Sequence, residues 1–182
     1  MAEPYLVATA GLLLVAGHET TVNLIGNGML TLLRYPAIFE RLRNQADLMP
    51  ATVEEVLRYE PPVQFLTQRT TLDEIALAGT TIPKGVLVTL ALAAGNRDPE
   101  QFPDPDRFDP ERRDNEHLGF GSGIHICFGS PLARLEAQIA FTELVRRLSQ
   151  PSLVVEPPPY RPSPLLRGPE HLLIAVEGVR KS

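Results

Sequence analysis

Hydrophobic residues recur at three- and four-residue spacing from Tyr5 to Arg34, a pattern typical of one long helix. Apolar residues also fill its other faces, so we expect this helix to be central in the fold. A polar island, residues 17–21, interrupts the apolar stretch. Similar spacing predicts three further helices at Phe39–Asn44 (with Pro36 in its first turn), Ala51–Tyr59 and Pro131–Leu148.

Short runs rich in β-branched and apolar residues, bounded by turn signals, predict strands. They lie at Phe65–Thr71, Glu74–Leu77, Val86–Leu90, Leu153–Val155 and Leu172–Val176. The 18 prolines concentrate in residues 99–110 and 151–169. Regular structure is not expected there, because proline lacks an amide donor and restricts the residue before it. The predicted fold class is mainly α with a small β-sheet.

Length and charge narrow the function classes. The chain has 182 residues, enough for one domain, and its 22 acidic against 17 basic residues favour no nucleic-acid partner. The longest apolar run, Tyr5 to Gly17, is too short to span a bilayer. A signal peptide is not expected either, because no basic residues precede this run. A single cysteine agrees with a reducing compartment. We therefore expect a cytoplasmic protein that contacts neither membrane nor nucleic acid.

The glycine-rich segment Phe120–Gly129 carries the strongest chemical signal. Its glycines at positions 121, 123 and 129 permit positive φ angles and a close approach to a flat ligand. Cys127, the only cysteine, stands just before a helix that has Pro131 in its first turn. The positive end of that helix favours a thiolate, which is the ligand that a haem iron needs for oxygen–oxygen bond cleavage.

Other interpretations of Cys127 are weaker. A lone cysteine is most often a small buried residue, but the glycines, the flanking aromatics and the following helix argue against that here. Zinc needs further cysteines or paired histidines at ligand spacing, which the sequence lacks. A nucleophilic pair with His125 remains open, although side chains two residues apart in an extended loop tend to point apart.

Residues 120–129 resemble the haem-binding signature of the cytochrome P450 family, the haem-thiolate monooxygenases. Residues 16–20 are similar to the oxygen-activating kink in the long central helix of that family, and residues 55–58 to its Glu-x-x-Arg motif. Arg69 stands where the family has a propionate-binding arginine. The meander before the cysteine loop is matched by residues 96–99 and 105–108. The resemblance points to the bacterial branch.

The resemblance implies a fold as well. Residues 1–182 would form the C-terminal, haem-binding part of a cytochrome P450 domain, with the N-terminal half absent. This part comprises a long central helix, the Glu-x-x-Arg helix, the meander, the cysteine loop and the helix that follows.

The resemblance also implies roles near the iron. Cys127 would be the axial ligand of the haem iron, and the haem would further contact residues of the loop and of the central helix: Phe120, Gly121, Gly129, Ala16 and Gly17. Thr20 and Glu19 would be the catalytic pair that delivers protons to bound oxygen. The structural alternative for Thr20 is a hydroxyl that bonds back to the preceding helical turn.

The same resemblance implies roles for two further groups of polar residues. Glu55 and Arg58 share a helical face and would lie in the core, joined by the meander arginine, for which Arg107 is the best candidate. Their role would be structural, setting the cysteine loop. Arg69 and His125 would hold the haem propionates, since a guanidinium matches a carboxylate. The alternative is that both are merely surface residues.

The resemblance implies haem b as the cofactor and O2 as the co-substrate. It also implies a small apolar organic substrate and electrons supplied by a ferredoxin or a similar protein. Arg112, Arg113 and Arg134 are candidate contacts for that redox partner. A second hypothesis is a truncated, catalytically inactive remnant that binds haem weakly, or only with a complementary chain. The uncovered apolar face of the central helix would then favour association.

Overall fold

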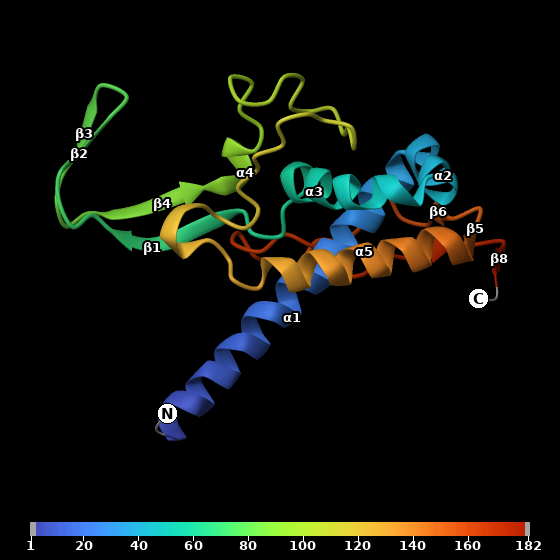
Figure 1. Cartoon of the computed structure of the whole chain (residues 1–182), viewed down its shortest axis with the longest axis horizontal. Helices are drawn as coiled ribbons and strands as arrows, with labels where there is room; N and C mark the ends of the chain where they lie inside the picture. Colours follow the sequence, from blue (N-terminus) through green and yellow to red (C-terminus); the bar gives the residue numbers. More distant parts are fainter. Residues whose placement is uncertain (1–2, 181–182) are drawn as a thin grey trace.

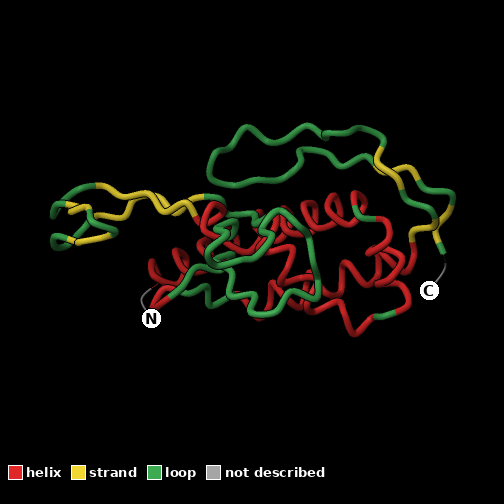
Figure 2. The backbone as a smooth tube through the Cα atoms, turned by 90° about the horizontal axis from the view of Figure 1, so that it is seen from above, coloured by secondary structure: helices red, strands yellow, loops and turns green. Residues whose placement is uncertain are grey.

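The computed structural model describes residues 3–180, and helices form most of its regular structure (Figures 1 and 2). The helices and 3-10 turns are α1 (Glu3–Arg34), α2 (Pro36–Asn44), η1 (Ala46–Leu48), α3 (Met49–Tyr59), α4 (Leu92–Gly95), η2 (Gly123–His125) and α5 (Ser130–Arg147). The strands are β1 (Phe65–Thr70), β2 (Ile75–Leu77), β3 (Thr80–Ile82), β4 (Leu87–Ala91), β5 (Leu148–Ser149), β6 (Ser152–Leu153), β7 (Ile174–Ala175) and β8 (Gly178–Val179). The predicted fold class is confirmed.

The hydrophobic core lies where the second half of α1 meets α2, α3 and α5 (Figure 1). Helix α5 crosses α1 closely enough that a Cβ atom on Gly28 would lie 2.1 Å from Cζ of Phe141. Glycine at this position therefore lets the two helices approach. The rest of the core consists of aliphatic and aromatic side chains from all four helices, among them Leu32, Phe39 and Val53.

Within residues 3–180 the strands form four separate two-stranded antiparallel ladders: β1 with β4, β2 with β3, β5 with β8, and β6 with β7. The β1–β4 ladder extends away from the helices and ends in the β2–β3 hairpin (Figures 1 and 2). A bulge interrupts the β1–β4 register between Leu66 and Arg69, where Gln68 has a φ of 60°.

The sequence-based strand predictions are confirmed for β1, β2 and β4, whereas β6 and β7 are two-residue strands within or beside longer predicted segments. Strands β3, β5 and β8 and helix α4 were not predicted. Two to four residues carry too little periodicity to reveal such elements, and their pairing with a distant partner decides their conformation.

Helix α1 has two contrasting halves. Every residue from Glu3 to His18 is exposed, whereas the run from Met29 to Leu32 is buried. The central position predicted for this helix is therefore correct only for its second half. The prediction of one long helix is confirmed, because α1 is continuous from Glu3 to Arg34 and the polar residues 17–21 lie within it. Figure 1 shows the first half projecting from the body of the protein.

By length and composition alone, α1 is apolar enough to cross a membrane. That observation is weak, because the core helix of a soluble protein passes the same test. The helix also carries His18 and Glu19 near its middle, and polar residues of this kind are costly in hydrocarbon.

Candidate functional site

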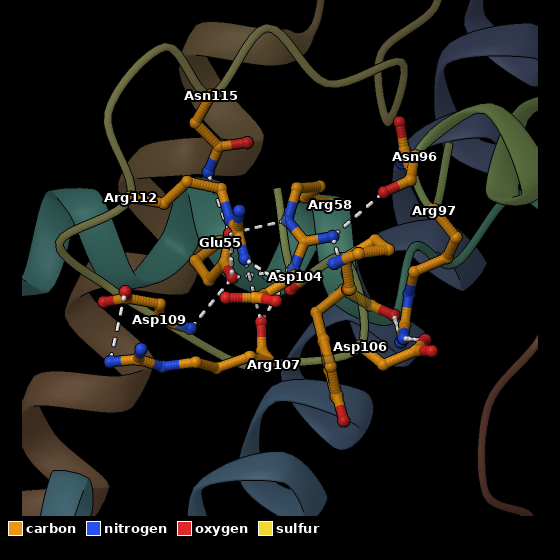
Figure 3. Close-up of polar contacts among 12 residues, drawn as sticks. Glu55, Arg58, Asn96, Arg97, Asp104, Asp106, Arg107, Asp109, Arg112 and Asn115 are labelled. Carbon is orange, nitrogen blue, oxygen red and sulfur yellow. Dashed lines mark hydrogen bonds and ion pairs between the residues drawn. The ribbon is translucent and has the colours of Figure 1, made fainter. Parts of the chain in front are cut away.

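The most enclosed polar group of the described structure is the Glu55–Arg58 pair on α3, with both side chains fully buried (Figure 3). The arginine Nη2 and Nε donate to the two carboxylate oxygens of Glu55, each at 2.8 Å. The prediction that this pair lies in the core is confirmed. A buried ion pair is tolerated only when its remaining hydrogen-bonding capacity is also satisfied.

Arg58 meets that condition completely. Its other three N–H groups donate to backbone carbonyls of the meander: Nη1 to Asn96 and Pro105, each at 2.9 Å, and Nη2 to Arg107 at 3.1 Å. All five donors of the guanidinium are thus used. Arg58 thereby holds together three separate points of a proline-rich segment that has little regular structure of its own.

The prediction that the Arg107 side chain joins this pair is wrong, since only its backbone carbonyl accepts from Arg58. The Arg107 side chain is 68% exposed and lies 3.5 Å from Asp109 (Figure 3). The arginine that reaches Glu55 is Arg112, whose Nε donates to Oε1 at 3.3 Å and whose side chain is 8% exposed. This burial also removes Arg112 from the candidate contacts for a redox partner.

Asn96 connects the cluster to the cysteine loop. Its amide nitrogen donates to the Leu57 carbonyl at 3.3 Å, and its oxygen accepts from the Leu118 N–H at 2.7 Å. The next residue, Gly119, lies so close to α3 that an added Cβ would stand 2.9 Å from the Leu57 carbonyl oxygen. The start of the loop is therefore pressed against the Glu-x-x-Arg helix, as the structural role predicted for Glu55 and Arg58 requires.

A second polar group, at Glu54, was missed by the sequence analysis. Arg134 on α5 donates to both oxygens of Glu54, with Nε at 2.7 Å and Nη2 at 2.9 Å, and His117 Nε2 lies 3.0 Å from Oε2. Partial burial raises the pKa of the Glu54 carboxyl, but the hydrogen bonds from His117 and Arg134 outweigh burial and lower it to about 2. These residues stand 63 and 80 positions from Glu54, so no sequence spacing signals the cluster.

The cysteine loop presents an apolar surface around a thiol. Cys127 is exposed, and so are the flanking side chains of Ile124 (97%), Ile126 (57%) and Phe128 (77%). The Cys127 N–H donates to the Phe120 carbonyl at 3.0 Å, which closes the loop. Gly121 and Gly123 have positive φ angles of 73° and 72°, so the expectation of unusual backbone angles is confirmed at these two glycines.

The predicted oxygen-activating residues lie at the boundary between the two halves of α1. The Thr20 hydroxyl donates to the Ala16 carbonyl at 2.7 Å, which is the local bond of the structural alternative. Glu19 lies 3.7 Å from Arg161 of the C-terminal segment. A Cβ on Gly17 would meet no atom within 4 Å, so there is open space beside this turn.

Arg69 and His125, the predicted propionate contacts, are both on the surface, one on β1 and the other in η2. Arg69 pairs with Val88 of β4 in the ladder. Their exposure suits a ligand that lies against the loop and the ladder, and their role stays a prediction.

The donors present suit haem better than a free metal ion. Among the described residues, no group of three or more histidines, cysteines, aspartates or glutamates is placed to hold a metal ion. A macrocycle that brings four ring nitrogens needs only an axial ligand from the protein. One exposed thiol within an apolar glycine loop would suit that role, with an apolar surface around it.

Comparison with known proteins agrees with this chemistry. The family profile described as cytochrome P450 matches residues 1–175. Cytochrome P450 107B1 of Saccharopolyspora erythraea is 49% identical over 174 residues, which are 94% of this chain and 43% of that protein. The monooxygenase PikC of Streptomyces venezuelae is 50% identical over 165 residues, or 90% of this chain and 40% of PikC.

Solved structures show the same relationship. CYP109E1 from Bacillus megaterium, in complex with testosterone, superposes with a TM-score of 0.93 at 39% identity, covering 97% of this chain and 49% of that one. P450BioI, in complex with a fatty-acid-ligated acyl carrier protein, gives a TM-score of 0.87 at 48% identity, covering 91% and 43%.

The chain belongs to the cytochrome P450 family, whose bacterial members are haem-using monooxygenases and hydroxylases. It spans less than half the length of the curated relatives that it matches. The matched region includes all of α1, so this helix is part of the P450 domain.

Proposed function

We propose that this chain carries the haem-binding and oxygen-activating part of a cytochrome P450 monooxygenase, with Cys127 as the axial thiolate ligand of haem b. The observation that supports this most is the exposed thiol of Cys127 within the apolar surface of Ile124, Ile126 and Phe128. A flat apolar macrocycle would cover these side chains and exclude water from the sulfur.

When bound, the haem supplies O2 activation and the insertion of one oxygen atom into the substrate. The chain's own residues would position the haem and deliver protons to bound oxygen. The backbone of Gly121 and Gly129 and the ring of Phe120 would lie against the macrocycle. Arg69 and His125 would donate to the propionates, since each is an exposed cation or N–H donor.

Proton delivery would use Thr20 and Glu19, which lie where the exposed half of α1 meets its buried half. Because the Thr20 hydroxyl gives its hydrogen to the Ala16 carbonyl, its oxygen keeps lone pairs to accept a hydrogen bond. Glu19, which is 45% exposed beside Arg161, would pass protons from solvent toward Thr20. The small residues Ala16 and Gly17 would leave room for oxygen.

We further propose a cytoplasmic enzyme that takes a small apolar substrate and receives electrons from a ferredoxin or a similar protein. Arg113 is exposed and Arg134 is partly exposed, so both remain candidate contacts for that protein. The complex of P450BioI with an acyl carrier protein that bears hexadec-9Z-enoic acid illustrates one apolar group that a relative binds.

The proposed haem ligation has a direct spectroscopic test. The purified chain is reconstituted with haemin, reduced and exposed to carbon monoxide. A Soret band strongly shifted to the red is expected, and the variant Cys127→Ser should lose it. A band at the unshifted position in the unaltered chain would overturn the ligand assignment. Turnover with NADPH, reductase and ferredoxin then tests the monooxygenase.

A second candidate function is favoured by the exposed first half of α1. Residues Leu6, Leu13 and Leu14 are 49–71% exposed, and neighbouring exposed apolar side chains of this kind mark interaction surfaces. The chain would then bind haem only together with a complementary chain that covers this surface. Haemin binding that appears only on co-expression with the N-terminal segment of a relative such as cytochrome P450 107B1 would support this candidate.

A further inference from the structure

We infer that Glu54 is a positioning residue for Cys127: its carboxylate holds the start of the cysteine loop through Arg134 and His117. This inference rests on the proposed function, because it concerns the loop that would present the haem ligand. It assigns to Glu54 a role separate from that of Glu55, its neighbour in the Glu-x-x-Arg motif.

The first branch runs through α5. Arg134 donates two hydrogen bonds to Glu54, and its guanidinium lies 4.6 Å from the centre of the Phe120 ring. A planar cation held over an aromatic face restrains that ring. Phe120 also accepts the Cys127 N–H at its carbonyl oxygen. One carboxylate thus orients Arg134, Arg134 covers Phe120, and Phe120 closes the loop onto Cys127.

The second branch runs through His117, whose side chain is 4% exposed. The Gly119 N–H donates to Nδ1 of His117 at 3.0 Å, which assigns an acceptor to Nδ1 and therefore the N–H to Nε2. Nε2 then donates to Glu54 at 3.0 Å. Both ring nitrogens are used, so the imidazole is held in place between α3 and the start of the loop.

The electrostatics agree with a firmly held carboxylate. Hydrogen bonding to Glu54 raises the pKa of Arg134, and the nearby Cys127 sulfur adds to this in smaller measure. The two neighbouring glutamates of α3 thus have different roles. The buried Glu55 holds the meander together through Arg58, and the partly buried Glu54 restrains the cysteine loop through Arg134 and His117.

The test compares Glu54→Gln with a matched control, Glu143→Gln. Both glutamates accept from arginines of α5, but Glu143 pairs with Arg146 and Arg147 at the other end of the helix, about 13 Å from Arg134 along the axis. Amide hydrogen exchange of the 182-residue chain, without haem, gives the first measurement. Glu54→Gln should exchange the Gly119 and Cys127 amides about tenfold faster. Buried amides of Leu24–Leu32 and the Glu143→Gln control should not change.

A second variant, Arg134→Lys, keeps the charge but loses the fork and the flat stacking surface. We expect it to loosen Cys127 while leaving Gly119 protected, because His117 still holds that end. Unchanged loop exchange in Glu54→Gln would overturn the inference, and so would equal acceleration in the control or acceleration throughout α1.

Haemin reconstitution supplies the spectroscopic signature. In Glu54→Gln the share of the red-shifted ferrous–CO band should fall severalfold relative to Glu143→Gln, with Arg134→Lys in between. An unchanged share in Glu54→Gln would contradict a role toward the ligand. If the unaltered chain shows no red-shifted band, the proposed function fails, whereas the exchange experiment still decides whether Glu54 holds the loop.

Discussion

The Glu55–Arg58 cluster and the cysteine loop are close in the structure but opposite in character. In the cluster both charged side chains are completely buried and every donor of Arg58 is paired. In the loop the thiol and three large apolar side chains are exposed. The Glu55–Arg58 cluster, whose hydrogen bonds are satisfied within the protein, thus supports the cysteine loop, whose exposed surface suits a bound ligand. Changes in the cluster should therefore alter stability, and changes in the loop should alter binding.

The largest effect is expected from Glu55→Ala, which leaves Arg58 charged and buried without its carboxylate. Breaking a buried pair in this way costs about 3–5 kcal/mol, a large part of the stability of a domain of this size. Urea unfolding followed by circular dichroism measures the loss.

The matched control is Arg41→Ala. Arg41 forms an equally bidentate pair with Glu111, at 2.7 and 2.8 Å, but on the surface. Its removal should leave the urea midpoint unchanged, since water replaces the lost partner. Equal losses in the two variants would show that burial of the Glu55 cluster is not what matters.

Within α1 a pair of glycines gives the next test. Gly28→Ala places a Cβ 2.1 Å from Phe141 and should destabilise the protein by about 1–3 kcal/mol through overpacking, with partial rescue by Phe141→Leu. Gly11→Ala, in the exposed half with no atom within 4 Å, should stabilise by about 0.5–1 kcal/mol through helix propensity. Thermal unfolding distinguishes the two signs.

A smaller, pH-dependent effect is expected at Glu54. Its folded pKa of about 2 lies below the ordinary value of 4.5, so its contribution to stability is complete above pH 4.5. It is lost as the pH falls toward 2, when the carboxylate facing Arg134 and His117 takes up a proton. The difference in unfolding free energy between the unaltered chain and Glu54→Gln should shrink over that interval. A constant difference from pH 6 to pH 2 would contradict the assignment.

The smallest effect on stability belongs to Leu13→Ser in the exposed half of α1. Because Leu13 is 49% exposed, the unfolding free energy should change by no more than about 0.5 kcal/mol. Self-association, measured by sedimentation velocity, should decrease because the apolar surface becomes smaller. A large loss of stability would mean that this half of the helix is packed in solution.

The sequence predicted the features that depend on local pattern. The spacing of apolar residues indicated α1, α2, α3 and α5, and three-residue spacing placed Glu55 beside Arg58. Motif resemblance, rather than periodicity, placed that pair in the core. The exposure of the first half of α1 followed from the family resemblance, which implied an uncovered apolar face on this helix, and not from helical spacing, because the apolar pattern is the same whether or not another element covers the helix.

Contacts between segments far apart in the chain could not be predicted from the sequence. Arg107 and Arg112 lie in the same proline-rich segment, and only the path of the backbone decides that Arg112 turns inward. The Glu54 cluster joins three elements through side chains that look individually ordinary. His117 in particular had no distinguishing neighbour in the sequence, since its partners are a backbone N–H and a carboxylate of α3.

The central claim, that Cys127 binds the haem iron, is tested most directly by X-ray absorption at the iron edge of the haemin-reconstituted chain. We predict one sulfur neighbour in addition to the four ring nitrogens, and its disappearance in Cys127→Ser. An iron without a sulfur neighbour in the unaltered chain, or a sulfur signal that persists in Cys127→Ser, would contradict the account.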